Sequence, residues 1–392
     1  MTRRVRLGTD LGLVNEWNTV HLLEALSPAV RASTRRERGR AAKTRDWMAV
    51  GPQLFELAPV DDCDVAVLPF AWEDVDGVET APAPHRRGDA ERFAALAAGH
   101  GRPLLVFHQE DWWAEVPLPE AIVFRQSMYR STAGERDILM PGWVLDPLET
   151  GLPTISPRPY RSPPSVGFCG FAALPDRDAP LTSRAEAFAR SRVRRLRCAL
   201  GLDDRRGRQP PVHLRSDAVR ALMRATAVLP DVVVRSEPMS IVEPPEGSRP
   251  GDDERRREYL DALARNDYVL AVRGRGNYSG RMYEAMAAGR VPVFVDTDSP
   301  LPWPGTIDWD ALVVRVDQRD IRRLGRVVRA AHDRMSPEEF ASRQASCRET
   351  WDRHLRMSAY FTQVHDRIVA ALEAGPLLGP PGRQRLLAEL HR

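Results

Sequence analysis

The residue types best suited to chemistry gather between Arg273 and Glu284, where arginines and glycines alternate ahead of one carboxylate. Guanidinium groups bind phosphate oxygens through paired hydrogen bonds, and glycines let the backbone turn sharply and approach a ligand closely. Arg281 falls in the first turn of an expected helix, where the helix dipole disfavours a cation. A phosphate bound at that helix start would explain the arginine. The pattern therefore predicts an anion-binding site.

The flanking sequence indicates the elements that must position these residues. Residues 268–272 form a short apolar run with β-formers, which is typical of a buried parallel strand. A glycine loop at 273–276 ends this strand, and a helix follows that Gly289 closes as a C-terminal cap. The apolar residues that recur at helical spacing on the packing face of this helix are Met282, Ala285 and Met286.

Strand and helix patterns alternate along the rest of the chain, which indicates an α/β protein with two doubly wound sheets. A proline-rich stretch from Leu152 to Pro164 is the expected linker between two domains. We therefore assign residues 1–160 to a first Rossmann-like domain and residues 161–350 to a second. Further strands are expected at 5–8, 64–70, 103–107, 121–124, 138–140, 166–170, 231–234 and 312–316.

From residue 259 to about 350 the sequence resembles the C-terminal half of the exostosin-like glycosyltransferases, family 47 of the sugar-nucleotide transferases. The order and spacing of many positions make this resemblance specific, whereas the glycine loop alone would be a weak signal. The matching residues are Arg273, Gly274, Gly276, Ser279, Arg281, Glu284, Ala285, Ala288, Gly289, Pro292, Val293, Leu301, Pro302, Asp308 and Trp309.

The resemblance implies a GT-B-like fold, in which two Rossmann-like domains face a central cleft. It implies transfer of a hexosyl or pentosyl group from a nucleotide diphosphate sugar, expected to be a UDP-sugar, to a hydroxyl of a saccharide or glycosylated acceptor. It also implies inversion at the anomeric carbon and no essential metal or other cofactor. By analogy with two-domain sugar transferases, helices in residues 351–392 are expected to pack back onto the first domain.

The donor site is expected at the helix start already described, with Glu284 accepting hydrogen bonds from the ribose hydroxyls. Gly170 joins it because residues 166–170 resemble the start of the family's second domain. The alternative is a surface ion pair between Arg281 and Glu284, worth only ~0.2–0.5 kcal/mol. The donor-binding residues expected are Arg273, Gly274, Arg275, Gly276, Ser279, Arg281, Glu284 and Gly170.

An inverting transfer needs a base that takes the proton of the acceptor hydroxyl, and this base should come from the first domain. The strand at 103–107 delivers three polar residues to its carboxyl end, which faces the ligand crevice in open parallel sheets. We expect Asp111 to be the base, followed by Glu110. The other candidates are His108, Asp10 and Glu73, and each is also an ordinary capping or loop residue type. Trp112 and Trp113 either stack on a sugar or belong to the core.

Two rival functions are left open. A partner subunit that keeps the fold without turnover would retain Arg281 and Glu284 but lack a productive base. A metal-dependent transferase would use Asp296 and Asp298, which resemble the D-x-D motif that holds a divalent ion in another transferase fold. We weigh the metal reading lower because the motif lies late in the chain.

Composition and charge limit the classes of molecule that the protein is expected to bind. The net charge is only +3, which does not favour nucleic acid binding, and the basic residues are almost all arginines. The cysteines show no metal-ligand spacing. We see no secretory signal and no transmembrane segment, so we expect a cytoplasmic protein, and an acceptor attached to a membrane is left open. The oligomeric state is not predicted.

Overall fold

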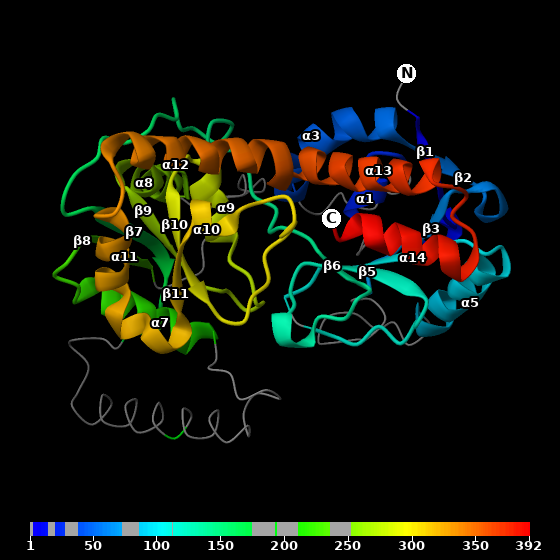
Figure 1. The fold of residues 1–392 in the computed structure, drawn as a ribbon, viewed down its shortest axis with the longest axis horizontal. Helices are drawn as coiled ribbons and strands as arrows, with labels where there is room; N and C mark the ends of the chain where they lie inside the picture. The colour runs from blue at the N-terminus through cyan, green and yellow to red at the C-terminus, as the bar shows by residue number, and fades with distance from the viewer. Residues whose placement is uncertain are drawn as a thin grey trace.

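The computed structural model describes residues 3–14, 20–27, 38–72, 86–111, 113–174, 193, 211–235 and 252–392. Two parallel sheets form the cores of two domains, which lie side by side in Figure 1. The predictions made for Glu73 and for Trp112 concern residues outside this description.

The first sheet is parallel throughout and has the strand order β2-β1-β3-β4-β5-β6. Its buried residues alternate between two clusters. Val67 and Leu105 face one cluster, while Ala66 and Val106 face the other, as the twofold period of a strand requires. Its strands are β1 (Val5–Gly8), β2 (Phe55–Ala58), β3 (Val65–Val67), β4 (Leu104–His108), β5 (Ala121–Arg125) and β6 (Asp137–Leu139).

Helices cover both faces of this sheet. The helix α5 (Arg86–Gly99) packs Ala90 and Phe93 onto one face. On the other face lie α1 (His21–Glu24), α3 (Arg38–Leu54) and a helix from the end of the chain, α13 (Met357–Glu373). A sheet covered on both faces is doubly wound, as predicted.

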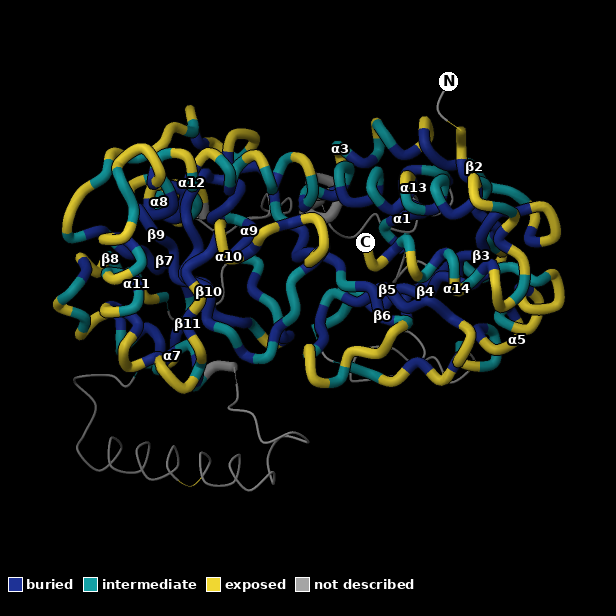
Figure 2. The backbone as a smooth tube through the Cα atoms, in the orientation of Figure 1, coloured by how far each residue is buried: buried dark blue, intermediate teal, exposed yellow. Residues whose placement is uncertain are grey.

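The second sheet has the strand order β11-β10-β9-β7-β8 and is also parallel. Its strands are β7 (Ser165–Phe171), β8 (Leu229–Arg235), β9 (Tyr268–Ala271), β10 (Val291–Asp296) and β11 (Val314–Asp317). The helices around it are α7 (Pro211–Met223), α8 (Asp252–Arg265), α9 (Gly280–Ala287), α10 (Trp309–Leu312) and α11 (Leu324–His332). Figure 2 shows the strands buried and the outer helix faces exposed.

The last helices return to the first domain (Figure 1). The helix α12 (Pro337–Thr350) lies on the second domain and runs through a π-helical turn at Trp351–Leu355 into α13. On the first domain, the hydroxyl of Tyr360 donates to the carbonyl of Leu139 at 3.1 Å. The final helix, α14 (Gly379–Leu390), packs against α13. The chain therefore crosses between the domains twice.

The two doubly wound domains confirm the predicted fold class. The sequence pattern did not predict the helices α7 and α11 or the strand β2. No helix in the described ranges has both the length and the apolar character that crossing a membrane requires.

Candidate active site

A cavity of about 300 Å³ lies between the two domains. The first domain contributes Asp111, Gln126, Gly142, Trp143 and Val144 to its wall. The second domain contributes most of the predicted donor residues. Its lining residues are Cys169, Gly170, Phe171, Arg215, Tyr259, Val272, Gly274, Arg275, Tyr278, Ser279, Gly280, Arg281 and Glu284.

The position of the cavity follows from the order of the second sheet. β7 and β9 are neighbours, and the chain continues from them towards opposite edges of the sheet. Such a switch point leaves a crevice outside the carboxyl ends of the two strands, where ligands bind in open α/β sheets. Gly170 at the end of β7 and Gly274 after β9 both line this crevice. The sheet order therefore creates the site.

Arg281 is held close to the end of β7. Its Nη2 donates to the carbonyl of Cys169 at 2.9 Å, and its guanidinium carbon lies 4.6 Å from the centre of the Phe168 ring. A Cβ at Gly170 would lie 2.4 Å from this Nη2, so a larger residue there would displace the guanidinium, and the backbone φ of +152° also favours glycine. The Nε of Arg281 is buried and has no hydrogen-bond partner in the described part of the protein.

A second arginine, which the sequence analysis missed, joins Arg281 in the cavity wall. Arg215 comes from α7 and donates to the carbonyl of Arg273 at 3.1 Å. Burial and the nearby charge of Arg281 lower the pKa of Arg215 to about 10, while Asp111 opposes this. Its Nε is also buried without a hydrogen-bond partner among the described residues. The positive charges of Arg215 and Arg281 therefore repel each other, and a bound anion would offset this repulsion.

The carboxylate of Glu284 is hydrogen-bonded to a tyrosine rather than to the neighbouring Arg281. The hydroxyl of Tyr259 donates to Glu284 Oε2, and both residues line the cavity. Burial and the charge of Glu284 raise the pKa of Tyr259 well above its ordinary value, so the phenol stays protonated as a donor. These contacts differ from the alternative interpretation, which was an ion pair between Arg281 and Glu284 on the surface.

The start of α9 opens onto the cavity. Ser279 is its N-cap residue, and the serine side chain makes no capping hydrogen bond. Ser279, Gly280 and Arg281 all line the cavity. The first N–H groups of a helix carry partial positive charge and point at any anion bound there. This helix start therefore adds to the charge of the two arginines.

Asp111 reaches the cavity from the first domain, as predicted from its place after a strand. Tyr278 lies beside it in the cavity wall, and burial and the charge of Asp111 raise the pKa of the Tyr278 hydroxyl. A Cβ at Gly276 would lie 2.7 Å from the backbone oxygen of Asp111, so the glycine loop touches the first domain there. Glu110 accepts the backbone N–H of Asp111 at 3.4 Å, and it is absent from the cavity wall.

The four residues of the predicted glycine loop, 273–276, lie in different places. Gly274 and Arg275 line the cavity. Arg273 is 4% exposed and donates to the hydroxyl of Tyr129 in the first domain at 3.2 Å, so this contact crosses the domain boundary. Gly276 supports the same boundary through its contact with Asp111. The loop thus contributes both to the cavity wall and to the contact between the two domains.

The other candidate bases are less suited to proton transfer. His108 is buried, and burial followed by the charge of Arg125 lowers its pKa to about 3. Asp10 accepts the backbone N–H of Gly12 at 2.9 Å and caps a short 3₁₀ helix, which is the ordinary role anticipated for it. Neither residue lines the cavity.

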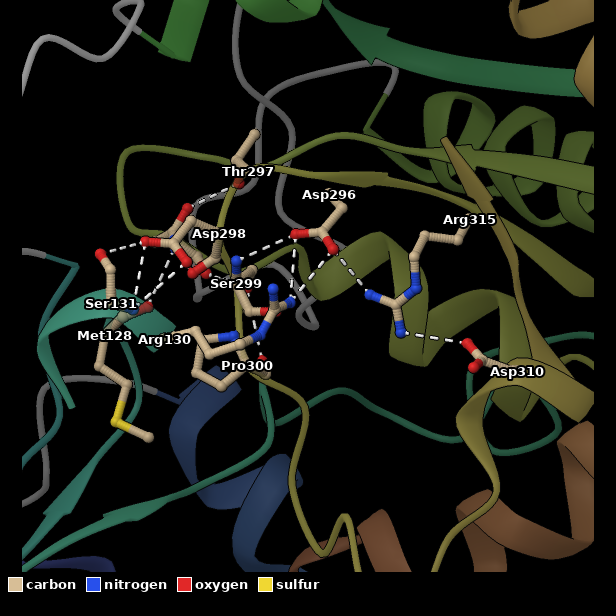
Figure 3. Close-up of polar contacts among 11 residues, drawn as sticks. Met128, Arg130, Ser131, Asp296, Thr297, Asp298, Ser299, Pro300, Asp310 and Arg315 are labelled. Carbon is tan, nitrogen blue, oxygen red and sulfur yellow. Dashed lines mark hydrogen bonds and ion pairs between the residues drawn. The ribbon is translucent and has the colours of Figure 1, made fainter. Parts of the chain in front are cut away.

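The aspartates of the D-x-D-like motif contact the opposite domain (Figure 3). Asp296 lies 3.1 Å from Nη2 of Arg130 and 2.8 Å from Nη1 of Arg315. Burial raises the pKa of Asp296, but hydrogen bonds from the two arginines outweigh it and the pKa falls below its ordinary value. Asp298 accepts the hydroxyl of Ser131 at 2.5 Å. No group of three or more metal-ligating side chains occurs in the described ranges.

Comparison with known proteins finds a recognised family model for part of the second domain. Residues 234–331 match the family model described as the Exostosin GT47 domain. The chain is 32% identical over 108 residues to the Exostosin-1 homolog of Caenorhabditis elegans, a match that covers 28% of this chain and 27% of that protein. It is 33% identical over 70 residues to the Probable glucuronoxylan glucuronosyltransferase IRX7 of Arabidopsis thaliana, over 18% of this chain and 16% of that protein.

The matched region is thus a minor part of each curated relative, at most 27% of its length in these two cases. Among solved structures, the one titled "Crystal Structure of TarM" aligns with 67% of this chain and 49% of its own, at 11% identity and a TM-score of 0.31.

Proposed function

Because residues 234–331 belong to the exostosin GT47 family, we propose that the whole chain is a glycosyltransferase. It moves a hexosyl or pentosyl group from a nucleotide diphosphate sugar to a hydroxyl of a saccharide or glycosylated acceptor. The glucuronosyltransferase named among the relatives supports sugar transfer, and we propose a UDP-sugar as the donor because the family resemblance of the sequence implies one. The donor occupies the cavity between the domains.

One observation carries this proposal: Arg215 and Arg281 lie together at the switch point of the second sheet, beside the start of α9. Each has a buried Nε without a hydrogen-bond partner in the described part of the protein. A diphosphate carries two or more negative charges and many acceptor oxygens, so it satisfies both guanidinium groups and the helix start at once. The carboxylate of Asp111, which interacts with Arg215, can neutralise only part of the positive charge of the two arginines.

The same groups suit the chemical step. When the bond between the sugar and the diphosphate breaks, negative charge grows on the leaving phosphate oxygen. Arg215, Arg281 and the N–H groups of α9 are already in place to stabilise that charge, so the reaction we propose requires no metal ion. Glu284 lies one helical turn beyond Arg281, where its carboxylate can accept hydrogen bonds from the ribose.

The metal-dependent alternative has less support. Asp296 and Asp298 are engaged by Arg130, Arg315 and Ser131, and neither lines the cavity. A divalent ion at this place would have to displace two arginines. The proposal of a direct, inverting transfer rests instead on the acceptor approaching from the first domain, where Asp111 and Trp143 form the wall.

The test is the thermal stability of the protein with UDP, other nucleoside diphosphates and UDP-sugars, each with and without a chelator. A ligand that binds only the folded state stabilises it by about 2.7 kcal/mol at ~100 times its Kd, which raises the melting temperature. We expect a shift with UDP that survives the chelator. Arg281→Ala and Arg215→Ala should each remove most of it, because each leaves the diphosphate with one guanidinium fewer.

The matched control is Arg326→Ala, which removes an exposed arginine of α11 without touching the cavity. This variant should keep the full shift. A protein that shows no shift with any nucleotide would contradict the proposed donor site, and a shift abolished by the chelator would favour the metal-dependent alternative. Location in the cytoplasm is a separate proposal, to be tested by fractionation of the native host.

A further inference from the structure

A buried tyrosine of the second domain reaches the wall of the donor cavity. Tyr259 belongs to α8, is 2% exposed and lines the cavity. It shares an apolar cluster with Cys169 of β7 and with Ala285 of α9. Close-packed neighbours restrict the movement of such a ring, so the hydroxyl of Tyr259 is held at one place in the wall.

The hydroxyl of Tyr259 holds the carboxylate of Glu284 with a neutral group. It donates to Oε2 of Glu284, and a hydrogen bond to an ionised oxygen is one of the stronger kinds in proteins. Burial, followed by the charge of Glu284, raises the pKa of Tyr259, so the phenol keeps its proton and remains a donor. The bond therefore fixes the carboxylate and brings no positive charge to it.

Glu284 would otherwise have a cation within reach. Arg281 precedes it by three residues in α9, a spacing at which oppositely charged side chains meet on a helix. In the structure the two side chains bind different partners, since Arg281 donates to the carbonyl of Cys169 at 2.9 Å while Glu284 accepts the hydroxyl of Tyr259. Arg281 is nevertheless near enough for its charge to lower the pKa of Tyr259, against the effect of Glu284. The tyrosine thus lies where an ion pair could form.

An ion pair between Arg281 and Glu284 would weaken the donor site. Opposite charges attract each other more strongly in a cavity shielded from water than on a surface. A carboxylate bound to Arg281 would occupy N–H groups that a phosphate needs, and its negative charge would repel the phosphate. The diphosphate would then have to displace Glu284 before it reached the guanidinium.

We propose that Tyr259 is a positioning residue, which directs the carboxylate of Glu284 away from Arg281 and so keeps the guanidinium available to the diphosphate of the donor. This inference rests on the proposed glycosyltransferase function. The tyrosine does not itself bind the phosphate, because its hydroxyl donates to Glu284. Its effect on the diphosphate is exerted through the carboxylate and depends on the negative charge of Glu284.

The experiment measures the binding of inorganic pyrophosphate by isothermal titration calorimetry, with UDP titrated in parallel. Pyrophosphate carries two linked phosphates without a ribose, so it reports on the phosphate contacts and not on those of Glu284 with a ribose. Tyr259→Phe keeps the ring and removes only the hydroxyl. Glu284 can then pair with Arg281, and the Kd for pyrophosphate should rise by about tenfold, as expected for the loss of a hydrogen bond to a charged group.

A double-mutant cycle separates this role from a merely structural one. In Glu284→Gln the amide has no charge with which to hold Arg281, so adding Tyr259→Phe to that variant should leave the Kd for pyrophosphate nearly unchanged. A tyrosine that bound the phosphate itself, or that only supported the fold, would cost the same affinity in both backgrounds. Equal losses would therefore overturn the assignment.

The matched control is Tyr268→Phe, which removes a buried hydroxyl of β9 that lies 2.9 Å from Nδ1 of His332 and outside the cavity wall. It should lower the melting temperature and keep the wild-type Kd for pyrophosphate. Full affinity in Tyr259→Phe would overturn the role of the tyrosine and leave the donor site intact. A wild-type protein that binds neither pyrophosphate nor UDP would overturn the proposed function itself.

Discussion

Gly170 separates the end of β7 from the guanidinium of Arg281, and the space between them has no room for a methyl group. A Cβ would lie 2.4 Å from Nη2, and the backbone φ of +152° is one that other residues rarely adopt. Gly170→Ala should therefore push Arg281 away from the carbonyl of Cys169. We expect UDP affinity to fall by about tenfold or more, equivalent to ~1.4 kcal/mol, measured by isothermal titration calorimetry.

Gly274→Ala is the matched control for this change. It adds the same methyl group to another glycine of the cavity wall, where the nearest contact, Nη2 of Arg215, would be 3.6 Å away. This distance is ordinary van der Waals contact, so UDP affinity should change little. Equal losses in the two variants would show that the cavity tolerates no added methyl anywhere, and that Gly170 has no special relation to Arg281.

The difference between Arg281 and Arg215 shows which site residues a sequence can reveal. Arg281 lies within a contiguous motif, so its neighbours identify it. Arg215 comes from a helix far upstream and meets Arg281 only because β7 and β9 pair in the folded sheet. Leu214, Ala218 and Leu222 recur at helical spacing and could have predicted α7. Nothing in that spacing indicates that the arginine beside them faces a cavity.

Among the elements, α12 lies far from the site, and a short local sequence motif sets the residue at which this helix begins. Ser336 accepts the N–H of Glu339, and Glu339 accepts the N–H of Ser336, which together form a capping box. Further along the same helix, Gln344 binds the backbone N–H and carbonyl of Arg158, at 2.9 and 3.0 Å. The helix therefore also ties the proline-rich linker to the second domain.

Ser336→Ala should destabilise the protein by about 1 kcal/mol, because an N-cap side chain satisfies an N–H group that the helix cannot. Ser342→Ala, at an exposed position within α12, should be neutral or slightly stabilising, since alanine is the better helix former. Urea unfolding of both variants measures the difference. Equal stabilities would mean that the capping box contributes nothing measurable to α12.

At the scale of the whole molecule, one segment of the first domain binds the second domain beside the cavity. The N–H of Asn277 donates to Oγ of Ser127 at 2.9 Å, and the N–H of Arg130 donates to the carbonyl of Asp298 at 2.8 Å. Arg130 also pairs with Asp296 (Figure 3). The two aspartates were expected only as a metal-binding motif, because a pairing across domains leaves no local sequence pattern.

This junction should make the two domains unfold together at neutral pH. Arg130→Ala removes the ion pair to Asp296 and the hydrogen bond to the carbonyl of Ser299, so calorimetry should show two separate transitions. Asp298→Asn is the milder change, because asparagine tolerates the positive φ of 64° and the backbone hydrogen bond from Arg130 remains. It should keep a single transition. A single transition in Arg130→Ala would show that the crossing helices α12 and α13 suffice to couple the domains.

The same junction should weaken in acid. The pKa of Asp296 is lower in the folded protein than its ordinary value, so its ionised form is favoured by folding. Such a group contributes stability above its unfolded pKa, near 4, and loses it as the pH falls through the lower folded value. Wild-type protein should therefore split into two transitions as the pH drops below about 4. The Arg130→Ala variant should already show two transitions at neutral pH. Acid should increase the difference between their melting temperatures less than in the wild type, because one of the two arginines that bind the Asp296 carboxylate is gone.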